Sequence, residues 1–426
     1  MALYLGAVLG TGVLGLPALT ADTAGPASLL AWGGIALLSA PLAAMFAALA
    51  ARHPDAGGIS TFARRAFGPR AAAVTGWWFY IGVPLGGVPA AALFAGAYVA
   101  AAVGAGHATA VGAGSALFLT AVAANLVGLR LSGRLQLVLS GLLVVLLVVA
   151  VTFSASHAQS SNLHPFAPHG WDAIAPAALL LVWSFTGWEA VTHLAGEFAH
   201  PARDVRRATT TAVVAIGVLY LAVAAATILV LGPTAGGTDA PLALLLSQAF
   251  GGSATTVAAV VAVIVTFGTM NTWLASFAKL GAALGRDGVL PAWLAHGSRV
   301  GEVPRRSLIT VAALSAAALL ALGISDVSVR PAVLLATACF VAVYAIAAAA
   351  GVRLLPPGAG RRCAIVSLLV ALVLAWTAGW YLLWPATLAG GALWYLGSRH
   401  RGQPAATGRT AGSSASGTSA NTNEVA

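Results

Sequence analysis

The sequence reads GTGVLG at residues 10–15 and SFTGWE at residues 184–189, each inside a long apolar stretch. Glycine weakens a helix, and Pro17 follows the first of these clusters. At membrane depth, such clusters predict a broken helix whose backbone N–H and C=O groups are freed to line a cavity. We therefore expect two broken membrane helices, one in each half of the chain, and the rest of the fold follows from that pair.

The composition is that of an integral membrane protein. Of the 426 residues, 59% are hydrophobic and 8% are charged, whereas a soluble domain carries about 25% charged residues. The apolar residues come in runs of about 20, the length that crosses a bilayer, rather than in the alternation of barrel strands. Hydropathy predicts an all-α protein with twelve transmembrane helices, at residues 3–22, 27–51, 71–103, 114–130, 134–153, 173–198, 208–232, 254–283, 306–323, 332–353, 362–380 and 383–397.

The positive charge is distributed unevenly across these spans. The net charge is +10, and twenty of the 21 Lys and Arg residues fall in connections on one face, whereas the opposite face has only Arg330. The positive-inside rule makes the basic face cytoplasmic and places both termini there. The charge therefore indicates topology, and no nucleic-acid partner is expected.

A second pair of related segments accompanies the two breaks. Residues 66–69 read Ala-Phe-Gly-Pro after the second span, and residues 249–252 read Ala-Phe-Gly-Gly after the seventh. The first lies inside and the second outside, as an inverted repeat requires. We predict a first repeat, a second repeat, an appended pair of helices and a disordered cytoplasmic tail, at residues 1–153, 173–353, 362–397 and 398–426. Only nine residues precede Gly10, so we expect either a shortened first half-helix or a start farther upstream.

The broken helices predict a site for an amino acid. Freed N–H groups and the positive end of the following half-helix suit a carboxylate, and freed carbonyls suit an ammonium group. The alternative is that Gly10, Gly12 and Gly15 only allow close helix packing. Trp183 and Phe185 flank the second break and are candidates to cover a substrate.

An acidic residue is placed near mid-membrane by this assignment. Glu189 follows the second glycine break, and His193 and Glu197 follow at four-residue intervals, on one face of a continuous helix. Such a ladder predicts a proton relay through Glu189 and His193, since imidazole titrates near neutrality. Alternatively, Glu189 satisfies loose backbone N–H groups, and Glu197 pairs with a cytoplasmic arginine.

The remaining candidate pocket is apolar, which favours neutral substrates. Sodium coupling would use hydroxyls in residues 254–283, namely those of Thr266, Thr269, Thr272 and Ser276, but such hydroxyls commonly bond their own helix. We therefore favour the proton as the coupling ion. The sequence contains no nucleotide-binding loop, hydrolase elbow or metal-ligand cluster, so no catalytic residue, metal site, cofactor or enzymatic activity is expected.

Four stretches resemble the amino acid–polyamine–organocation (APC) superfamily. They are GTGVLGLPA at 10–18, HPDAGGISTFARRAFG at 53–68, FTGWEAVTHLAGEFAHPARDVRRA at 185–208 and LGRDGVLP at 284–291. The sequences of these stretches resemble those of the bacterial amino-acid efflux branch most closely. The resemblance implies a LeuT-type fold of two inverted five-helix repeats. It also implies substrate binding by residues of both breaks, namely Gly10, Thr11, Gly12, Val13, Leu14, Trp183, Ser184, Phe185, Thr186 and Gly187.

The resemblance further implies what the protein does. We expect a permease of the bacterial inner membrane that exports methionine, leucine, isoleucine and valine by proton antiport, with the lipid bilayer and its amino-acid substrate as partners. An importer or exchanger of the same fold is the alternative. A membrane amino-acid sensor is a third hypothesis, but neither terminus offers an output domain.

Overall fold

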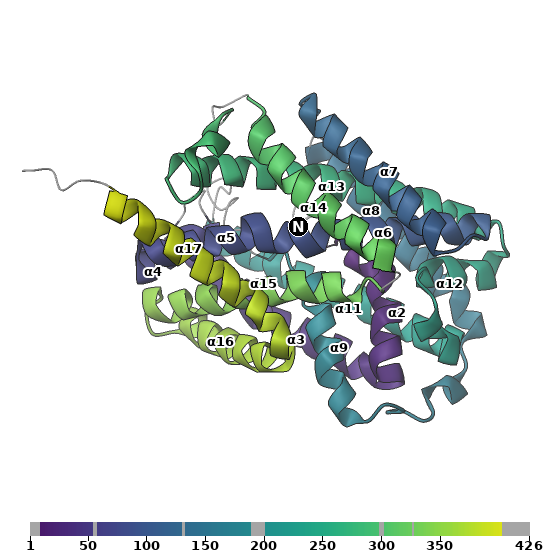
Figure 1. The fold of residues 1–426 in the computed structure, drawn as a ribbon. Helices are drawn as coiled ribbons and strands as arrows, with labels where there is room; N and C mark the ends of the chain where they lie inside the picture. The colour runs from purple at the N-terminus through teal and green to yellow at the C-terminus, as the bar shows by residue number, and fades with distance from the viewer. Residues whose placement is uncertain are drawn as a thin grey trace, which may run out of the picture.

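The computed structural model describes residues 9–53, 58–129, 133–188, 201–297, 302–325 and 328–402. All regular structure in these ranges is helical (Figure 1). The α-helices are α2 (Gly12–Ala24), α3 (Ser28–Arg52), α4 (Gly58–Phe67), α5 (Pro69–Trp77), α6 (Val83–Val103), α7 (His107–Leu126), α8 (Gly133–Ser154), α9 (Ile174–Leu181), α11 (Pro201–Leu231), α12 (Pro241–Phe250), α13 (Ala254–Arg286), α14 (Arg305–Ser325), α15 (Arg330–Leu354), α16 (Ala359–Ala378) and α17 (Leu383–Gly402).

Nine helical stretches of the described residues are long and apolar enough to cross a membrane. Three of them, Gly12–Arg52, Pro69–Val103 and Ala359–Ser398, each contain two consecutive α-helices. The span expected at 173–198 begins as α9, and its second half lies outside the described residues. The protein is thus a multi-pass helical membrane protein, and the count of twelve spans stays a prediction.

Several boundaries differ from the hydropathy assignment, among them the start of α11, at Pro201 rather than at 208. α7 begins at His107 rather than at 114, because its first turns are rich in alanine and glycine, which contribute little hydropathy although alanine favours helix. α17 continues to Gly402, beyond the predicted end at 397. The remainder of the predicted tail, residues 403–426, lies outside the described residues.

The helices pack around two hydrophobic cores. The first core gathers side chains of α2, α3, α9 and α11, whereas the second gathers α7, α14 and parts of α6 and α13. α6 serves both, because Phe94 and Tyr98, four residues apart, face the first core and Leu93 faces the second. α13 also serves both, with Val265 in the first core and Met270 in the second. The two cores therefore meet along α6 and α13.

The two short helices α4 and α12 have the same length and the same ending. Each has ten residues and ends at a phenylalanine, Phe67 or Phe250. The following glycines, Gly68 and Gly251, have φ of 90° and 83°, a region that favours glycine. Each glycine N–H donates to the carbonyl four residues earlier, at 2.8 Å. The related sequence segments therefore adopt the same local structure.

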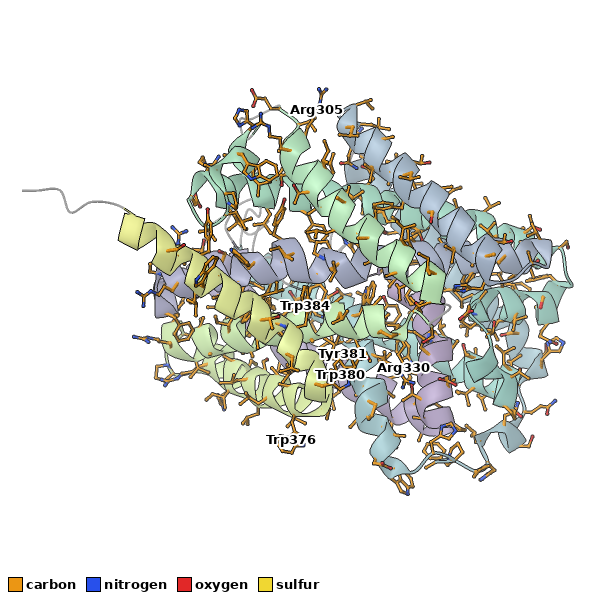
Figure 2. All side chains as sticks on the ribbon, viewed as in Figure 1. Arg305, Arg330, Trp376, Trp380, Tyr381 and Trp384 are labelled. Atoms are coloured by element: carbon orange, nitrogen blue, oxygen red, sulfur yellow. The ribbon has the colours of Figure 1, made fainter. Side chains whose placement is uncertain are left out.

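The last two helices pack on different neighbours. α16 lies along α15 and α3, whereas α17 lies along α5 (Figure 1). Their outward faces are apolar and uncovered: Trp376 and Trp394 have 87% and 76% of their surface exposed, and Trp376 points outward in Figure 2. Such a surface fits lipid rather than water.

Candidate functional site

The first break lies at the start of α2. Gly10 has no regular structure, Thr11 forms a turn, and α2 begins at Gly12. The Leu14 N–H donates to the Thr11 carbonyl at 3.1 Å, while the first N–H groups of a helix have no partner inside it. Gly10 and Thr11 thus lie at the break, and Gly12, Val13 and Leu14 form the first turn of the helix that follows.

The second break follows α9. The chain tightens into a 3₁₀ turn, η6 (Trp183–Phe185), and leaves the helix at Thr186, whose ψ is 158°. Gly187 follows with φ of 109°, a conformation that favours glycine. Trp183, Ser184, Phe185, Thr186 and Gly187 therefore all belong to this break.

The two breaks meet in the interior. α2 and α9 lie side by side (Figure 1). A β-carbon on Gly12 would lie 2.6 Å from Ser184 Oγ. Both Thr11 and Ser184 are buried, at 0% and 1% exposure, and their hydroxyls have no hydrogen-bond partner among the residues that the structure describes. Buried hydroxyls without a partner are costly, so this junction favours a polar ligand.

The two aromatic residues of the second break face opposite ways. The Trp183 ring lies 6.1 Å from that of Phe94 on α6 and 6.3 Å from that of Trp273 on α13. The Phe185 ring lies 5.3 Å from that of Tyr220 on α11. Both residues belong to the first core. Trp183 lies on its side toward α6 and α13, where the two cores meet, whereas Phe185 packs against α11.

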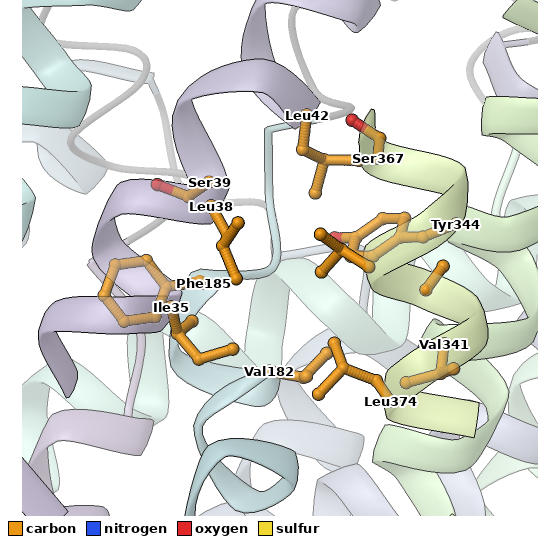
Figure 3. A pocket seen from close by; sticks show the side chains of 12 residues that line it. Ile35, Leu38, Ser39, Leu42, Val182, Phe185, Val341, Tyr344, Ser367 and Leu374 are labelled. Carbon is orange, nitrogen blue, oxygen red and sulfur yellow. The ribbon is translucent and has the colours of Figure 1, made fainter. Parts of the chain in front are cut away.

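A small cavity lies behind Phe185 (Figure 3). It has a volume of about 50 Å³ and is lined by α3, by Val182 after α9, and by η6, α15 and α16. The lining residues are Ile35, Leu38, Ser39, Leu42, Val182, Phe185, Val341, Tyr344, Ser367, Val370, Ala371 and Leu374. A cavity that binds benzene has about 150 Å³. This cavity is therefore too small to be the amino-acid site.

Two tyrosines that sequence reasoning did not single out hold the first break. The Tyr98 hydroxyl donates to the Leu14 carbonyl at 2.8 Å and accepts the Leu242 N–H at 3.2 Å, which joins α6, α2 and α12. The Tyr220 hydroxyl of α11 interacts with the backbone of Gly10. A buried tyrosine hydroxyl usually finds a partner. A single tyrosine in an apolar span was therefore the feature of the sequence that could have indicated these contacts.

The hydroxyls considered for sodium divide into two groups. Those of Thr269, Thr272 and Ser276 donate to carbonyls of α13 itself, four residues earlier. Thr266 is fully buried, and its hydroxyl has no partner. Thr266 is thus the one of the four whose hydroxyl has no partner among the described residues, and it lies on the part of α13 between the two cores.

The predicted proton-coupling residues, Glu189 and His193, lie outside the described residues. Their position relative to the two breaks stays a prediction. The described part of the site is polar only through backbone groups and hydroxyls.

Comparison with known proteins places the chain in a family. The model of the amino acid permease family matches residues 1–356. The chain is 33% identical over 400 residues to an uncharacterized amino acid permease, YecA of Bacillus subtilis, covering 93% of both chains. It is 32% identical over 397 residues to the L-methionine/branched-chain amino acid exporter YjeH of Escherichia coli, covering 91% of this chain and 92% of that protein. It is also 26% identical over 319 residues to the branched-chain amino acid permease BcaP of Bacillus subtilis, covering 70% of this chain and 64% of that one. The chain is therefore a member of the amino acid permease family of transporters, within the APC superfamily.

Proposed function

We propose that this permease exports neutral, apolar amino acids, namely methionine, leucine, isoleucine and valine, by proton antiport through alternating access. The observation that carries the proposal is the junction of the two breaks, where Gly12 packs against Ser184 and the buried hydroxyls of Thr11 and Ser184 have no partner. An amino acid brings the polar groups that this junction lacks.

The ends of the two helices suit the two charges of the substrate. The first turn of α2 has unpaired N–H groups and the positive end of the helix dipole, which favour the carboxylate. Carbonyls near the end of α9 would favour the ammonium group. That of Trp183 already accepts from the Thr186 N–H and hydroxyl, so the candidates are the carbonyls that follow it, from Ser184 on. An α-amino acid carries a carboxylate and an ammonium group this close together.

The walls of the junction support an apolar side chain. Phe94 lies against Gly15, and its ring is 6.1 Å from that of Trp183, the residue before Ser184. A second cation would lose hydration worth several kcal/mol unless a partner faced it. The name of YjeH, a methionine and branched-chain amino acid exporter, agrees in substrate class and is our reason for proposing export.

The two cores support movement of one group of helices against the other. α2, α3, α9 and α11 would move against α7, α14 and their neighbours, with the substrate between them. We further propose the LeuT-type arrangement, with repeats at 1–153 and 173–353, α16 and α17 appended, and both termini on the cytoplasmic side of a bacterial inner membrane. The matching ends of α4 and α12 support the repeat.

Proton coupling is proposed through Glu189 and His193. The sequence supports it, because Glu189 and His193 are an acid and an imidazole four residues apart in a predicted membrane span. α8, which spans Gly133–Ser154, also contains no lysine to replace an ion.

Transport in proteoliposomes tests the proposal. Labelled methionine, leucine and arginine are loaded inside or outside, with and without an imposed pH gradient, and with sodium or potassium as the bulk cation. We expect methionine and leucine to accumulate on the acidic side of the membrane, against their own concentration gradient, because protons move in the opposite direction. This accumulation should not depend on sodium. Equal transport of arginine would contradict the apolar pocket, and a requirement for sodium would contradict proton coupling.

An importer or exchanger of the same substrates is the second candidate, favoured by the name of the branched-chain amino acid permease BcaP. The same experiment separates the two. An exchanger moves labelled leucine only when unlabelled leucine is present on the other side, whereas a proton antiporter also moves it in response to the pH gradient alone.

A further inference from the structure

A second, larger cavity lies between α8, α12 and α13. It has a volume of about 400 Å³, whereas a cavity of about 150 Å³ is enough to bind benzene. Its walls come from α8 between Leu142 and Val149, from Leu246 and Phe250 of α12, and from the first turns of α13. It extends about 10 Å along α8, since a helix rises about 1.5 Å per residue. We call this cavity the α12 groove.

The groove lies in the half of the membrane away from the basic face. α8 carries Arg134 near its start and α13 ends at Arg286, so the second half of α8 and the start of α13 lie toward the opposite face. Phe153 and Phe250, whose rings are 5.0 Å apart, stand at that end of α8 and α12. Aromatic rings are enriched at the boundary between lipid and water. The groove therefore lies just below that boundary, at the depth of the lipid chains.

The lining of the groove is apolar apart from one hydroxyl. Nine of its ten lining residues are apolar, and the tenth, Ser253, lies just before the first residue of α13. Water occupies a cavity when it finds about two to four polar partners, and a carboxylate or ammonium group would lose its hydration here without compensation. The groove thus suits neither water nor an amino-acid zwitterion, whereas it suits an uncharged hydrocarbon chain.

The groove has an exposed rim and a buried floor. Val145 of α8 and Val257 of α13 are both 59% exposed, whereas Leu246 and Val261, which also line the groove, are buried. A helix of another protein would rest on the two rim valines, because a helix with its side chains is about 10–12 Å wide. A single methylene chain is thin enough to reach the floor. This shape favours a lipid acyl chain over a second protein.

α12 connects the groove to the first break. The Leu242 N–H in the first turn of α12 donates to the Tyr98 hydroxyl at 3.2 Å, and that hydroxyl donates to the Leu14 carbonyl of α2 at 2.8 Å. Leu246 and Phe250 follow Leu242 at four-residue intervals, so the three residues share one face of α12. A molecule that fills the groove therefore supports the helix to which the start of α2 is linked.

We propose that the α12 groove binds one acyl chain of a membrane phospholipid, and that this chain holds α12 in place. The chain is recognised by shape, because inside a bilayer apolar groups attract one another through packing. The headgroup contributes little, since none of the described residues that line the groove is charged. The site is separate from the junction of the two breaks and takes a ligand of a different chemical class.

Photochemical labelling tests the site. The protein is reconstituted into vesicles of phosphatidylethanolamine and phosphatidylglycerol with a trace of phosphatidylcholine that carries a diazirine in its acyl chain, and mass spectrometry identifies the labelled residues. A second phosphatidylcholine carries the diazirine on its headgroup. The groove-filling variant is Val145→Phe with Val257→Phe. The matched control is Val148→Phe with Val260→Phe, because these valines lie on the same two helices, are 47% and 52% exposed, and lie outside the groove lining.

We expect the chain probe to label the groove more strongly than the exposed apolar surface at Val138 and Ile264. Labelling of the groove should fall roughly two- to tenfold in the groove-filling variant, since the packing contacts that hold the chain are individually weak. It should be unchanged in the control, and the headgroup probe should not label the floor. Val257→Phe alone should give a smaller decrease than the double change, and it replaces the double variant if that protein does not fold.

Hydrogen exchange measures the effect of the chain on α12. Protein stripped of lipid in detergent is compared before and after addition of dioleoyl or dihexanoyl phosphatidylcholine. The long-chain lipid should slow exchange of the backbone amides in Pro241–Phe250, because a filled groove opposes local opening of the helix. The short-chain lipid should slow it less, and the groove-filling variant should respond to neither lipid.

Labelling of the groove no stronger than that of Val138 and Ile264 would overturn the site, as would an equal decrease in the control or labelling of the floor by the headgroup probe. A dimer on size-exclusion chromatography whose groove is unlabelled would assign the groove to a second copy of the chain instead. Unchanged exchange on addition of the dioleoyl lipid would overturn the support of α12. These measurements use no amino acid, so labelling as expected without transport would retain the site and reject the proposed function.

Discussion

Gly12 of α2 packs directly against Ser184 of η6, so that a β-carbon on Gly12 would lie 2.6 Å from Ser184 Oγ and 3.4 Å from Ser184 Cα. The contact joins residues 172 positions apart, the difference between 184 and 12, and it brings the two broken helices together. Glycine is required here by the close approach of Ser184, since Gly12 lies inside α2 and is not among the glycines of positive φ.

Gly12→Val should abolish transport while leaving membrane insertion intact, because its branched side chain enters the space of Ser184. Gly12→Ala should impair transport as well, and adding Ser184→Gly should restore part of substrate binding by removing the Oγ that the methyl group meets. Binding of labelled methionine to purified protein measures both effects. Gly33→Ala is the control, since a β-carbon on Gly33 of α3 meets nothing within 4 Å. Normal affinity in Gly12→Val would show that the break is not the binding site.

Trp183 and Phe185 should respond differently to the same change. Trp183→Leu should raise KM for methionine and leucine about tenfold or more, because its ring lies at the junction and loses contacts worth about 1–2 kcal/mol. Phe185→Leu should instead lower the unfolding temperature, since its ring packs against Trp32 and Tyr220 in the first core, and should leave KM nearly unchanged. Flux kinetics and thermal unfolding in detergent measure the two effects. Equal changes in KM would contradict the separation of the two rings.

Tyr98→Phe should weaken both stability and transport. It leaves the Leu242 N–H without its buried partner and removes the hydroxyl that bonds the Leu14 carbonyl, at a cost of about 1–3 kcal/mol. Tyr80→Phe is a comparison, because the Tyr80 hydroxyl donates to the Ser307 carbonyl in the second core. Both variants should unfold at lower temperature, but only Tyr98→Phe should lower substrate affinity. Equal substrate affinity in the two variants would assign Tyr98 to packing alone.

Glu189→Gln should uncouple transport from the pH gradient. The amide keeps the shape and hydrogen-bonding capacity of the protonated acid but carries no exchangeable charge, so exchange of leucine across the membrane should survive in part. His193→Gln should slow proton-driven flux less, since water can replace one member of a relay. Side-by-side measurement of gradient-driven flux and exchange compares the two variants. If Glu189→Gln still accumulates leucine in response to a pH difference, Glu189 does not carry the coupling proton. If the variant no longer binds leucine, the role of Glu189 is instead to maintain the structure of the second break.

Much of the architecture was predictable because it depends on local composition. Apolar runs identify membrane spans wherever they occur, and the glycines at 10–15 and at 187 locate the breaks because helix propensity is a property of neighbouring residues. The endings of α4 and α12 were visible for the same reason, since Gly68 and Gly251 adopt the φ that follows from having no side chain.

The sequence by itself therefore determined a helical membrane protein with two broken segments and identified the residues of both. Only the tertiary structure decided which way those residues face. It turned Trp183 toward α6 and α13 and Phe185 toward α11 within the first core. It left the Thr266 hydroxyl without a partner among the described residues while Thr269 bonds its own helix, and it brought Arg330 to Asp22 across 308 positions, the difference between 330 and 22. Side-chain direction depends on helix rotation, and helix rotation is set by packing between helices distant in the chain. The spacing of residues along one helix does not contain that information.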